Sequence, residues 1–243
     1  MSKRAWGFRL FFTALVAMTA PPSLAQPHEK ETWIPVYITP YYEAAQTREG
    51  APRVAVNNGL NELLSSNKQA DILAARDLVE ANPATITPFS LMTLAIRMYD
   101  TGLRDDAVLW FYIGKYRAVT LVETVTFSRG PMSDGVYDAI GSYITLAGPY
   151  FNGYAFCDPD KQKATNTAAI DWVEAHPYQT IYAPGLASRV KPGGVEANLA
   201  KSIASLRESA AKEAAQMDDP EFRAEFMETR KQNGMDVRFC WSA

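Results

Sequence analysis

Side chains that commonly carry catalysis or bind metals are scarce in this chain, which has two histidines and two cysteines in 243 residues. His28 and His176 are the two histidines, so a catalytic or metal-binding cluster built on several histidines is excluded. The sequence also shows no glycine-rich phosphate loop, zinc spacing or calcium loop. We therefore expect no metal site and no cofactor. His176 precedes Pro177, and a histidine that ends a helix is favourable there without any further function.

The two cysteines are Cys157 and Cys240. In an exported protein, an even pair of cysteines predicts one disulfide. This bond would tie the C-terminal end of the chain back to its middle. Two alternatives stay open at this stage. One is a free thiol, either buried or reactive, and the other is a nucleophilic Cys157–His176 pair, which competes with the disulfide.

Carboxylates are the other groups that could do chemistry, as general acids or bases on glycans. Glu123 is the candidate catalytic residue, because it lies in an otherwise apolar stretch. An exposed position on a helix is the alternative for Glu123. The acidic pairs Asp105–Asp106 and Asp218–Asp219 each lie at a predicted helix start, where negative charge is favourable beside the positive end of the helix dipole.

Aromatic residues are concentrated over residues 110–116. Trp110, Tyr112 and Tyr116 lie within two helical turns, together with Phe111. Side chains at these spacings point in different directions around a helix, so they cannot all face one core. We therefore predict that Trp110, Tyr112 and Tyr116 form a face that binds a protein partner. The alternative is that neighbouring helices and an N-terminal arm cover them.

The elements that must position these residues are helical over most of the chain. Apolar residues recur at helical spacing over residues 60–64, 70–81, 88–101, 105–122, 133–146, 159–176, 195–217 and 220–233. Three of these helices start with a capping side chain followed by proline: Thr87-Pro88, Asp158-Pro159 and Asp219-Pro220. The predicted fold class is all-α, an irregular array of helical hairpins with about eight helices and an extended N-terminal arm.

Glycine and proline mark the predicted breaks between helices. Gly148-Pro149 is expected to end one helix, and Asn152-Gly153 is a turn dipeptide. Residues 178–194 are rich in proline and glycine and are predicted to be a loop or lid.

Residues 75–83 and 169–177 are similar to each other, since both contain Ala, Asp, Val, Glu, Ala and Pro at matching positions. The similarity indicates either two helix ends that obey the same stop rules or two halves of a duplicated unit.

Residues 88–119 carry apolar and small residues at the spacing of a helical hairpin: Leu91, Leu94, Ala95, Ala107, Phe111 and Gly114. The segment resembles a tetratricopeptide hairpin and, with Tyr99, Gly102 and Trp110, also a Sel1-type hairpin. It departs from the tetratricopeptide pattern at Met98 and Val119, where that family prefers Tyr and Pro. A further step of about 34 residues in either direction finds no good match. The resemblance implies a scaffold that binds other proteins.

The N-terminus predicts export. Lys3, Arg4 and Arg9 precede an apolar run over residues 10–20, which is shorter than the roughly 20 residues that span a bilayer. Small residues then lead to a predicted cleavage between Ala25 and Gln26. The chain is thus divided into a signal peptide over 1–25, an extended aromatic-rich arm over 26–56 and a single all-helical domain over 57–243. The predicted location is the bacterial periplasm or the medium outside the cell.

The charge of the chain bears on its partners. The net charge is −3, and removal of the basic signal peptide makes the mature chain more acidic. An acidic chain is a poor nucleic-acid binder, and no later segment predicts a membrane span. The leading hypothesis is an exported, non-enzymatic protein that binds another protein in the cell envelope, such as an immunity or inhibitor protein. The alternative is an envelope glycan hydrolase or glycan-binding protein that uses a carboxylate in an aromatic cleft.

Overall fold

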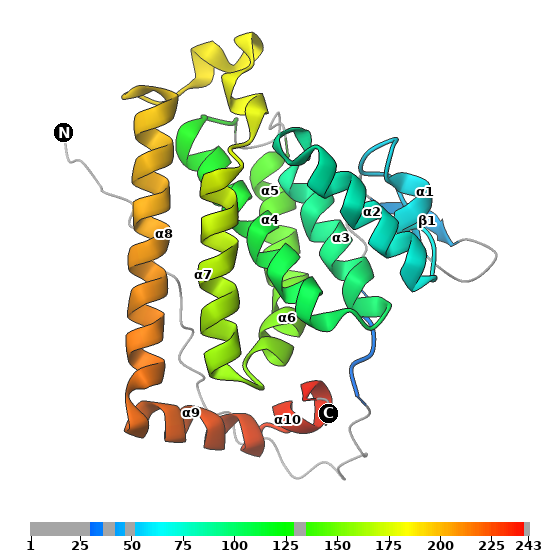
Figure 1. Cartoon of the computed structure of the whole chain (residues 1–243), viewed down its shortest axis with the longest axis vertical. Helices are drawn as coiled ribbons and strands as arrows, with labels where there is room; N and C mark the ends of the chain where they lie inside the picture. Colours follow the sequence, from blue (N-terminus) through cyan, green and yellow to red (C-terminus); the bar gives the residue numbers. More distant parts are fainter. Residues whose placement is uncertain (1–29, 36–41, 47–51, 129–134, 241–243) are drawn as a thin grey trace.

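Helices dominate the computed structural model, which describes residues 30–35, 42–46, 52–128 and 135–240 (Figure 1). Ten α-helices lie within these residues, so the predicted all-α fold is confirmed. Their bounds are α1 Asn61–Leu64, α2 Gln69–Ala81, α3 Pro88–Asp100, α4 Arg104–Thr124, α5 Val136–Ser142, α6 Gly148–Ala155, α7 Pro159–Ala175, α8 Gly194–Asp218, α9 Pro220–Gln232 and α10 Met235–Phe239. Shorter turns are η1 Pro83–Thr85, the π-helical η2 Tyr143–Ala147, η3 Gln179–Tyr182 and η4 Pro184–Arg189.

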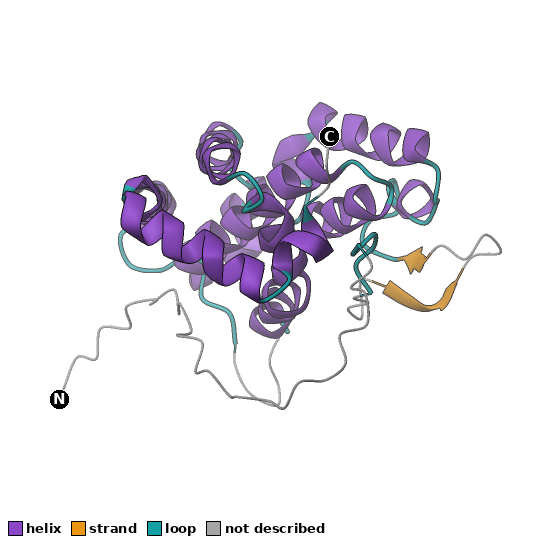
Figure 2. Ribbon diagram, turned by 90° about the horizontal axis from the view of Figure 1, so that it is seen from below, coloured by secondary structure: helices purple, strands orange, loops and turns teal. Residues whose placement is uncertain are grey.

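The described part of the predicted arm holds a small antiparallel sheet of β1 (Tyr42–Gln46) and β2 (Pro52–Val54). Figure 2 shows these strands at the edge of the helical body. Val54 and Ile34 are buried in the same core as the helices. The described parts of the arm therefore pack on the helical body. The predicted signal peptide, its cleavage between Ala25 and Gln26, and His28 lie outside the described residues.

The three predicted helix starts are confirmed. Thr87 Oγ1 accepts a hydrogen bond of 3.0 Å from the Ser90 amide at the start of α3. The side chains of Asp158 and Asp219 accept from backbone amides in the first turns of α7 and α9. Because these signals are local in sequence, they determine the starts whatever the rest of the fold does.

Helix α4 lies at the centre of the fold and packs against α3, α6, α7 and α8. Trp110, Tyr112 and Tyr116 are all buried. Neighbouring helices cover α4 on several sides, so aromatic residues that could not share one apolar stripe all enter the interior. The expectation that these three residues form an exposed binding face is therefore wrong.

Helices α3 and α4 form the hairpin expected over residues 88–119. They are joined by Thr101 to Leu103, where Gly102 adopts a left-handed φ of 90°. Gly114 of α4 lies against Met92 of α3, where a Cβ atom would come within 2.7 Å of Met92 Cγ. A residue without a side chain thus lets the two helix backbones approach closely.

The predicted break at Gly148-Pro149 is wrong, because α5, η2 and α6 form one continuous helical run. Proline cannot donate an amide hydrogen bond, and the wider π-helical turn before it alters the bonding pattern at that point. Asn152 and Gly153 are also helical rather than a turn. A Cβ atom at Gly153 would lie 2.7 Å from the Phe239 ring, so this glycine makes room for α10.

The segment predicted as a loop or lid, residues 178–194, is instead an anchored pair of 3₁₀ turns. Tyr178 and Ile181 are buried in a small cluster with Leu121 and Val125. The backbone is tied to the end of α4 as well, since Lys191 N donates to the Thr124 carbonyl at 2.9 Å. Its conformation is therefore fixed by the C-terminal end of α4.

Candidate functional site

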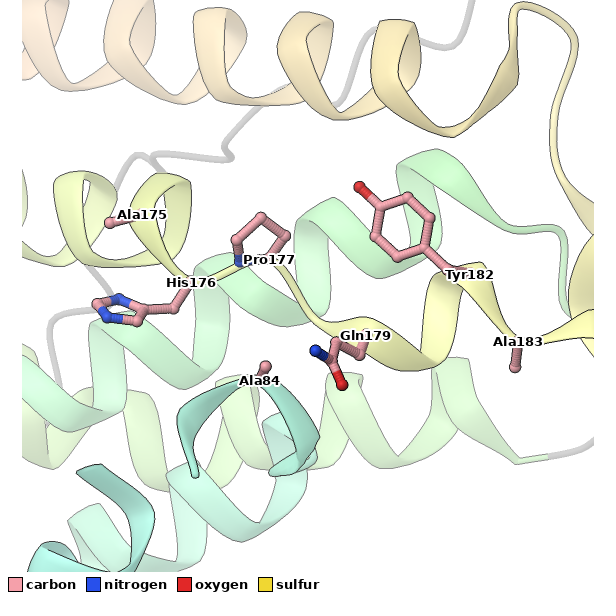
Figure 3. Close-up of a pocket in the computed structure, with 7 residues that line it drawn as sticks. All are labelled: Ala84, Ala175, His176, Pro177, Gln179, Tyr182 and Ala183. Carbon is pink, nitrogen blue, oxygen red and sulfur yellow. The ribbon is translucent and has the colours of Figure 1, made fainter. Parts of the chain in front are cut away.

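A shallow pocket of about 570 Å³ lies where η1, the end of α7 and η3 meet (Figure 3). Its lining comes from three short segments: Ala84, Ala175, His176, Pro177, Gln179, Tyr182 and Ala183. Tyr182 is 48% exposed, although it is a large aromatic residue. The pocket thus combines small side chains with the exposed Tyr182 ring, the exposed Gln179 amide and the imidazole of His176.

Helix α7 and helix α2, which precedes η1, end in the same way. Asn82 follows α2 with φ −138° and ψ 54°, and His176 follows α7 with φ −127° and ψ 69°. Each is followed by a proline, which disfavours the α-helical conformation in the residue before it. The similar sequences at residues 75–83 and 169–177 therefore give the same helix ending twice, on two sides of one pocket.

Arg117 of α4 joins these two ends. Its Nη1 donates to the carbonyl oxygens of Pro83 at 2.6 Å and Ile86 at 3.0 Å, and its Nη2 donates to that of His176 at 2.6 Å. His176 ends α7, where the carbonyls carry the negative end of the helix dipole, which favours a cation there. One side chain from the core thus positions both walls of the pocket.

The Arg117 side chain is fully buried. Its guanidinium carbon lies 4.7 Å from the Trp172 ring centroid and 5.7 Å from that of Tyr178. Burial lowers the pKa of Arg117 to about 10, so the guanidinium remains charged at neutral pH. Aromatic faces and backbone carbonyls replace the water that would otherwise solvate this cation.

His176 is held by the last turn of its own helix. Its Nδ1 lies 2.8 Å from the Trp172 carbonyl oxygen, and its ring packs on the Trp172 ring at 4.5 Å between centroids. Because a carbonyl only accepts, Nδ1 is the donor of this bond, and in the neutral ring Nε2 is left as the acceptor. Figure 3 shows the imidazole turned away from Tyr182. The helix-ending role expected for His176 agrees with this geometry.

The candidate acid Glu123 lies on an exposed part of α4, outside the pocket lining. Its Oε2 is 3.6 Å from Lys191 Nζ, with both side chains partly in solvent. An ion pair of this kind contributes little to stability. The structure thus gives Glu123 the exposed helical position that was its alternative interpretation.

The aromatic residues predicted to bind a partner connect helices inside the protein. The Tyr112 hydroxyl donates to Asn152 Oδ1 at 3.1 Å, and the Tyr116 hydroxyl donates to Asn166 Oδ1. Trp110 packs edge-on against Trp172 at 5.5 Å. Burial raises the pKa of both tyrosines, so their hydroxyls stay protonated. These side chains hold α4 to α6 and α7 and do not reach the pocket lining.

The disulfide between Cys157 and Cys240 is present. Neither cysteine is free, so the alternatives of a free thiol and of a Cys157–His176 pair do not apply to this structure. The two residues of that pair lie at opposite ends of α7.

Arg117 is the functional residue that sequence reasoning missed. The sequence does place an arginine in a helix that is apolar on several sides, and such a charge needs partners inside the fold. Those partners are backbone carbonyls distant in the sequence, so they cannot be predicted from a pattern of side chains.

Two further findings concern the part of the chain that the structure describes. No helix in it is long and apolar enough to cross a membrane. Among the same residues, no three or more histidine, cysteine, aspartate or glutamate side chains gather as a metal site would require.

Known proteins place the chain in a family. No model of a protein family matches it, and no solved structure matches it. A protein of Haemophilus influenzae described as an uncharacterized protein is 32% identical to it over 231 residues, which cover 95% of this chain and 87% of that protein. Identity at this level over nearly the whole length of both chains shows common descent, and this chain belongs to the same family as the Haemophilus influenzae protein.

Proposed function

We propose that this chain is an exported, non-enzymatic helical protein that binds another protein in the cell envelope, with the pocket around Tyr182 as the contact. The observation that carries the proposal is the pocket lining. Tyr182 and Gln179 offer an exposed aromatic ring and an amide beside small side chains. Tyrosine is enriched in protein interfaces because it combines a large apolar face with a polar tip.

The hydrogen bonds that fix the walls of the pocket support this role. Arg117 holds the carbonyls of Pro83 and His176, so both walls are fixed before a partner arrives. Tyr182 itself follows Ile181, which is buried in the cluster beneath η3. A surface that is already ordered loses little conformational entropy on binding, which favours affinity.

The partner that fits this site is a polypeptide segment carrying an apolar side chain and a backbone amide. The apolar side chain would lie against Tyr182 and the small residues, and the Gln179 amide would bond the partner backbone. The resemblance of residues 88–119 to tetratricopeptide and Sel1 hairpins, which bind proteins, supports the same class of function. An immunity or inhibitor protein is one form that this function would take.

The proposed location rests on two features. The predicted signal peptide over residues 1–25 would direct export, and a disulfide between Cys157 and Cys240 would persist in an oxidising compartment. We therefore propose the periplasm or the cell exterior as the place where the partner is met.

The test is capture of partners from a cell-envelope extract by the tagged protein, in three forms. Wild type, Tyr182→Ala and Leu146→Ala are compared, because Leu146 is 51% exposed but lies outside the pocket lining. We expect one stoichiometric protein that wild type and Leu146→Ala retain and that Tyr182→Ala binds about tenfold or more weakly.

Two results would overturn the proposal. Equal capture by Tyr182→Ala and wild type would show that the pocket is not the contact. Enrichment of cell-wall glycan without a stoichiometric protein would favour the glycan-binding alternative instead. Circular dichroism of each variant shows whether the helices are intact.

A further inference from the structure

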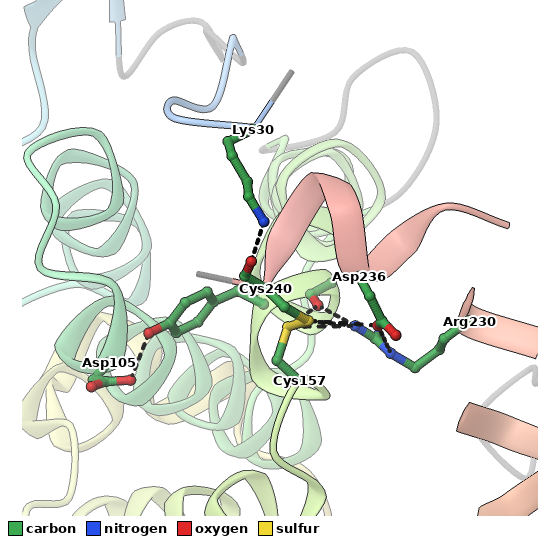
Figure 4. Close-up of a disulfide and its surroundings, with 8 residues drawn as sticks. Lys30, Asp105, Cys157, Arg230, Asp236 and Cys240 are labelled. Carbon is green, nitrogen blue, oxygen red and sulfur yellow. Dashed lines mark hydrogen bonds and ion pairs between the residues drawn. A yellow bond between two sulfur atoms is a disulfide. The ribbon is translucent and has the colours of Figure 1, made fainter. Parts of the chain in front are cut away.

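The disulfide lies against a buried positive charge. Cys157 follows α6, Cys240 follows α10, and Arg230 of α9 reaches both (Figure 4). Arg230 Nη2 is 3.6 Å from Cys157 Sγ and 3.7 Å from Cys240 Sγ. The arginine is only 6% exposed, so water screens its charge weakly.

This charge favours the reduced form of the cysteines. A disulfide is neutral, whereas reduction at neutral pH generates thiolate, which a nearby guanidinium stabilises. Stabilising the thiolate lowers the pKa of the thiol and makes that cysteine a better leaving group in thiol–disulfide exchange. Arg230 is thus placed where it would promote opening of the bond.

The surroundings of the two sulfur atoms differ. Asp236 Oδ1 lies 3.5 Å from Cys240 Sγ, and it also accepts from Arg230 Nε at 3.3 Å. The negative charge of the Asp236 carboxylate disfavours the thiolate form of Cys240. Cys157 Sγ instead lies 3.5 Å from the Gly153 carbonyl oxygen, which Arg230 Nη2 already binds at 2.9 Å. The more stable thiolate is therefore that of Cys157.

We propose that Cys157–Cys240 is a thiol–disulfide exchange site that takes a dithiol reductant. A thiolate of the reductant attacks Cys240 Sγ and forms a new S–S bond with it. The Cys157–Cys240 bond breaks, and its electron pair remains on Cys157 Sγ beside Arg230. The second thiolate of the reductant then attacks the reductant sulfur of the mixed disulfide. Cys240 leaves as a thiolate that takes up a proton, the reductant becomes a disulfide, and the protein gains two electrons.

Reduction would loosen both described ends of the chain. Residue Glu31 pairs with Arg238 of α10, with 2.9 Å between Glu31 N and the Arg238 carbonyl and 3.0 Å between their side chains. The same N-terminal segment reaches α3, because the Tyr99 hydroxyl donates to the Glu31 carbonyl at 3.0 Å. The disulfide holds α10 and thereby the surface on which this segment lies.

The test compares rates of reduction of the oxidised protein by dithiothreitol at pH 7. Arg230→Met keeps much of the apolar stem and removes the charge, and Asp236→Asn removes the opposing carboxylate. We expect the second-order rate constant to fall about tenfold in Arg230→Met and to rise in Asp236→Asn. If Arg230 only fastened α9 to α6, its loss would expose the bond and reduction would become faster, which would overturn the proposal.

A second measurement does not depend on the stability of the oxidised variants. In Cys240→Ser, the alkylation rate of Cys157 is followed against pH, with and without Arg230→Met. We expect Arg230→Met to lower the thiolate fraction of Cys157 at pH 7 about tenfold, and an unchanged pH profile would overturn the proposal. With glutathione as reductant, the trapped mixed disulfide should be on Cys240, and its location on Cys157 would contradict the order of attack.

Discussion

Arg117 Nη2 donates a hydrogen bond of 2.6 Å to the carbonyl oxygen of His176, the residue that ends α7. The second terminal nitrogen, Nη1, donates to the carbonyl oxygen of Pro83, the first residue of η1. A single buried cation from the central helix thus holds η1 and the end of α7, which both line the pocket. The geometry of the surface site depends on a residue that lies entirely inside the protein.

Replacement of Arg117 should strongly destabilise the fold. In Arg117→Met, the three carbonyls that the guanidinium binds lose this donor. We expect the free energy of unfolding in urea to fall by about 3 kcal/mol or more, because each buried carbonyl left without a donor costs about 1–3 kcal/mol. Arg207→Met is the control, because Arg207 is exposed and its loss should change stability by no more than about 0.5 kcal/mol. Equal urea midpoints for both variants would contradict the role assigned to Arg117.

Asp100 should make stability depend on pH. Its side chain is only 8% exposed at the end of α3, where it accepts from the Arg97 guanidinium and from Ile34 N. Burial raises the pKa of Asp100 to about 6, although Arg97 opposes this shift. The pKa in the unfolded chain is about 3.9. The folded state therefore holds the proton more tightly, so this contribution to stability is fully present below about pH 4 and is lost as the pH rises through about 6.

The measurement compares wild type with Asp100→Asn, which does not titrate. From pH 7.5 to pH 4, the stability of wild type relative to the variant should increase by about 2 kcal/mol in urea unfolding. Taking the difference at each pH cancels the contributions of other titrating groups. A constant difference between the two proteins would show that the pKa of Asp100 is the same in both states.

Substitutions at Trp110 and at Tyr182 should have different effects, the first on stability and the second on binding of the partner. Trp110 is buried against Trp172, so Trp110→Ala should lower the free energy of unfolding by about 3–5 kcal/mol. Tyr182 is half exposed, so Tyr182→Ala should affect capture of the partner while leaving thermal unfolding nearly unchanged. Loss of partner binding by a folded Trp110→Ala, with Tyr182→Ala unaffected, would contradict this separation and the assignment of the contact to Tyr182.

Local signals account for what the sequence could predict. Thr87, Asp158 and Asp219 cap helices because their side chains bond amides two or three residues later, and this needs no other part of the chain. The disulfide followed from an even pair of cysteines in a chain that is predicted to be exported. The all-α fold followed in the same way from apolar residues at helical spacing.

Contacts between residues that are distant in the sequence account for the features that the sequence could not predict. Gly153 indicates a turn by residue type, but it lies within α6 because Phe239 packs where a side chain would be. Tyr112 and Tyr116 point in directions that a single stripe would leave exposed, but several helices surround α4. The pocket is likewise assembled from Ala84 and from residues 175–183, which only the folded chain brings together.

The close packing of α3 on α4 should make Gly114 intolerant of a side chain. In Gly114→Ala, the added Cβ atom would lie 2.7 Å from Met92 Cγ, 3.0 Å from Met92 N and 3.1 Å from the Pro88 carbonyl oxygen. Two of these atoms belong to the backbone, so the helices must separate. We expect the free energy of unfolding to fall by about 1–3 kcal/mol, as for other overpacked cores.

Gly141→Ala is the matched control, because Gly141 is also helical but has nothing within 4 Å of the added atom. That variant should be up to about 1 kcal/mol more stable than wild type, since alanine favours a helix over glycine. Thermal unfolding of the pair checks both signs, and stabilisation by both alanines would show that α3 and α4 are not in close contact at Gly114.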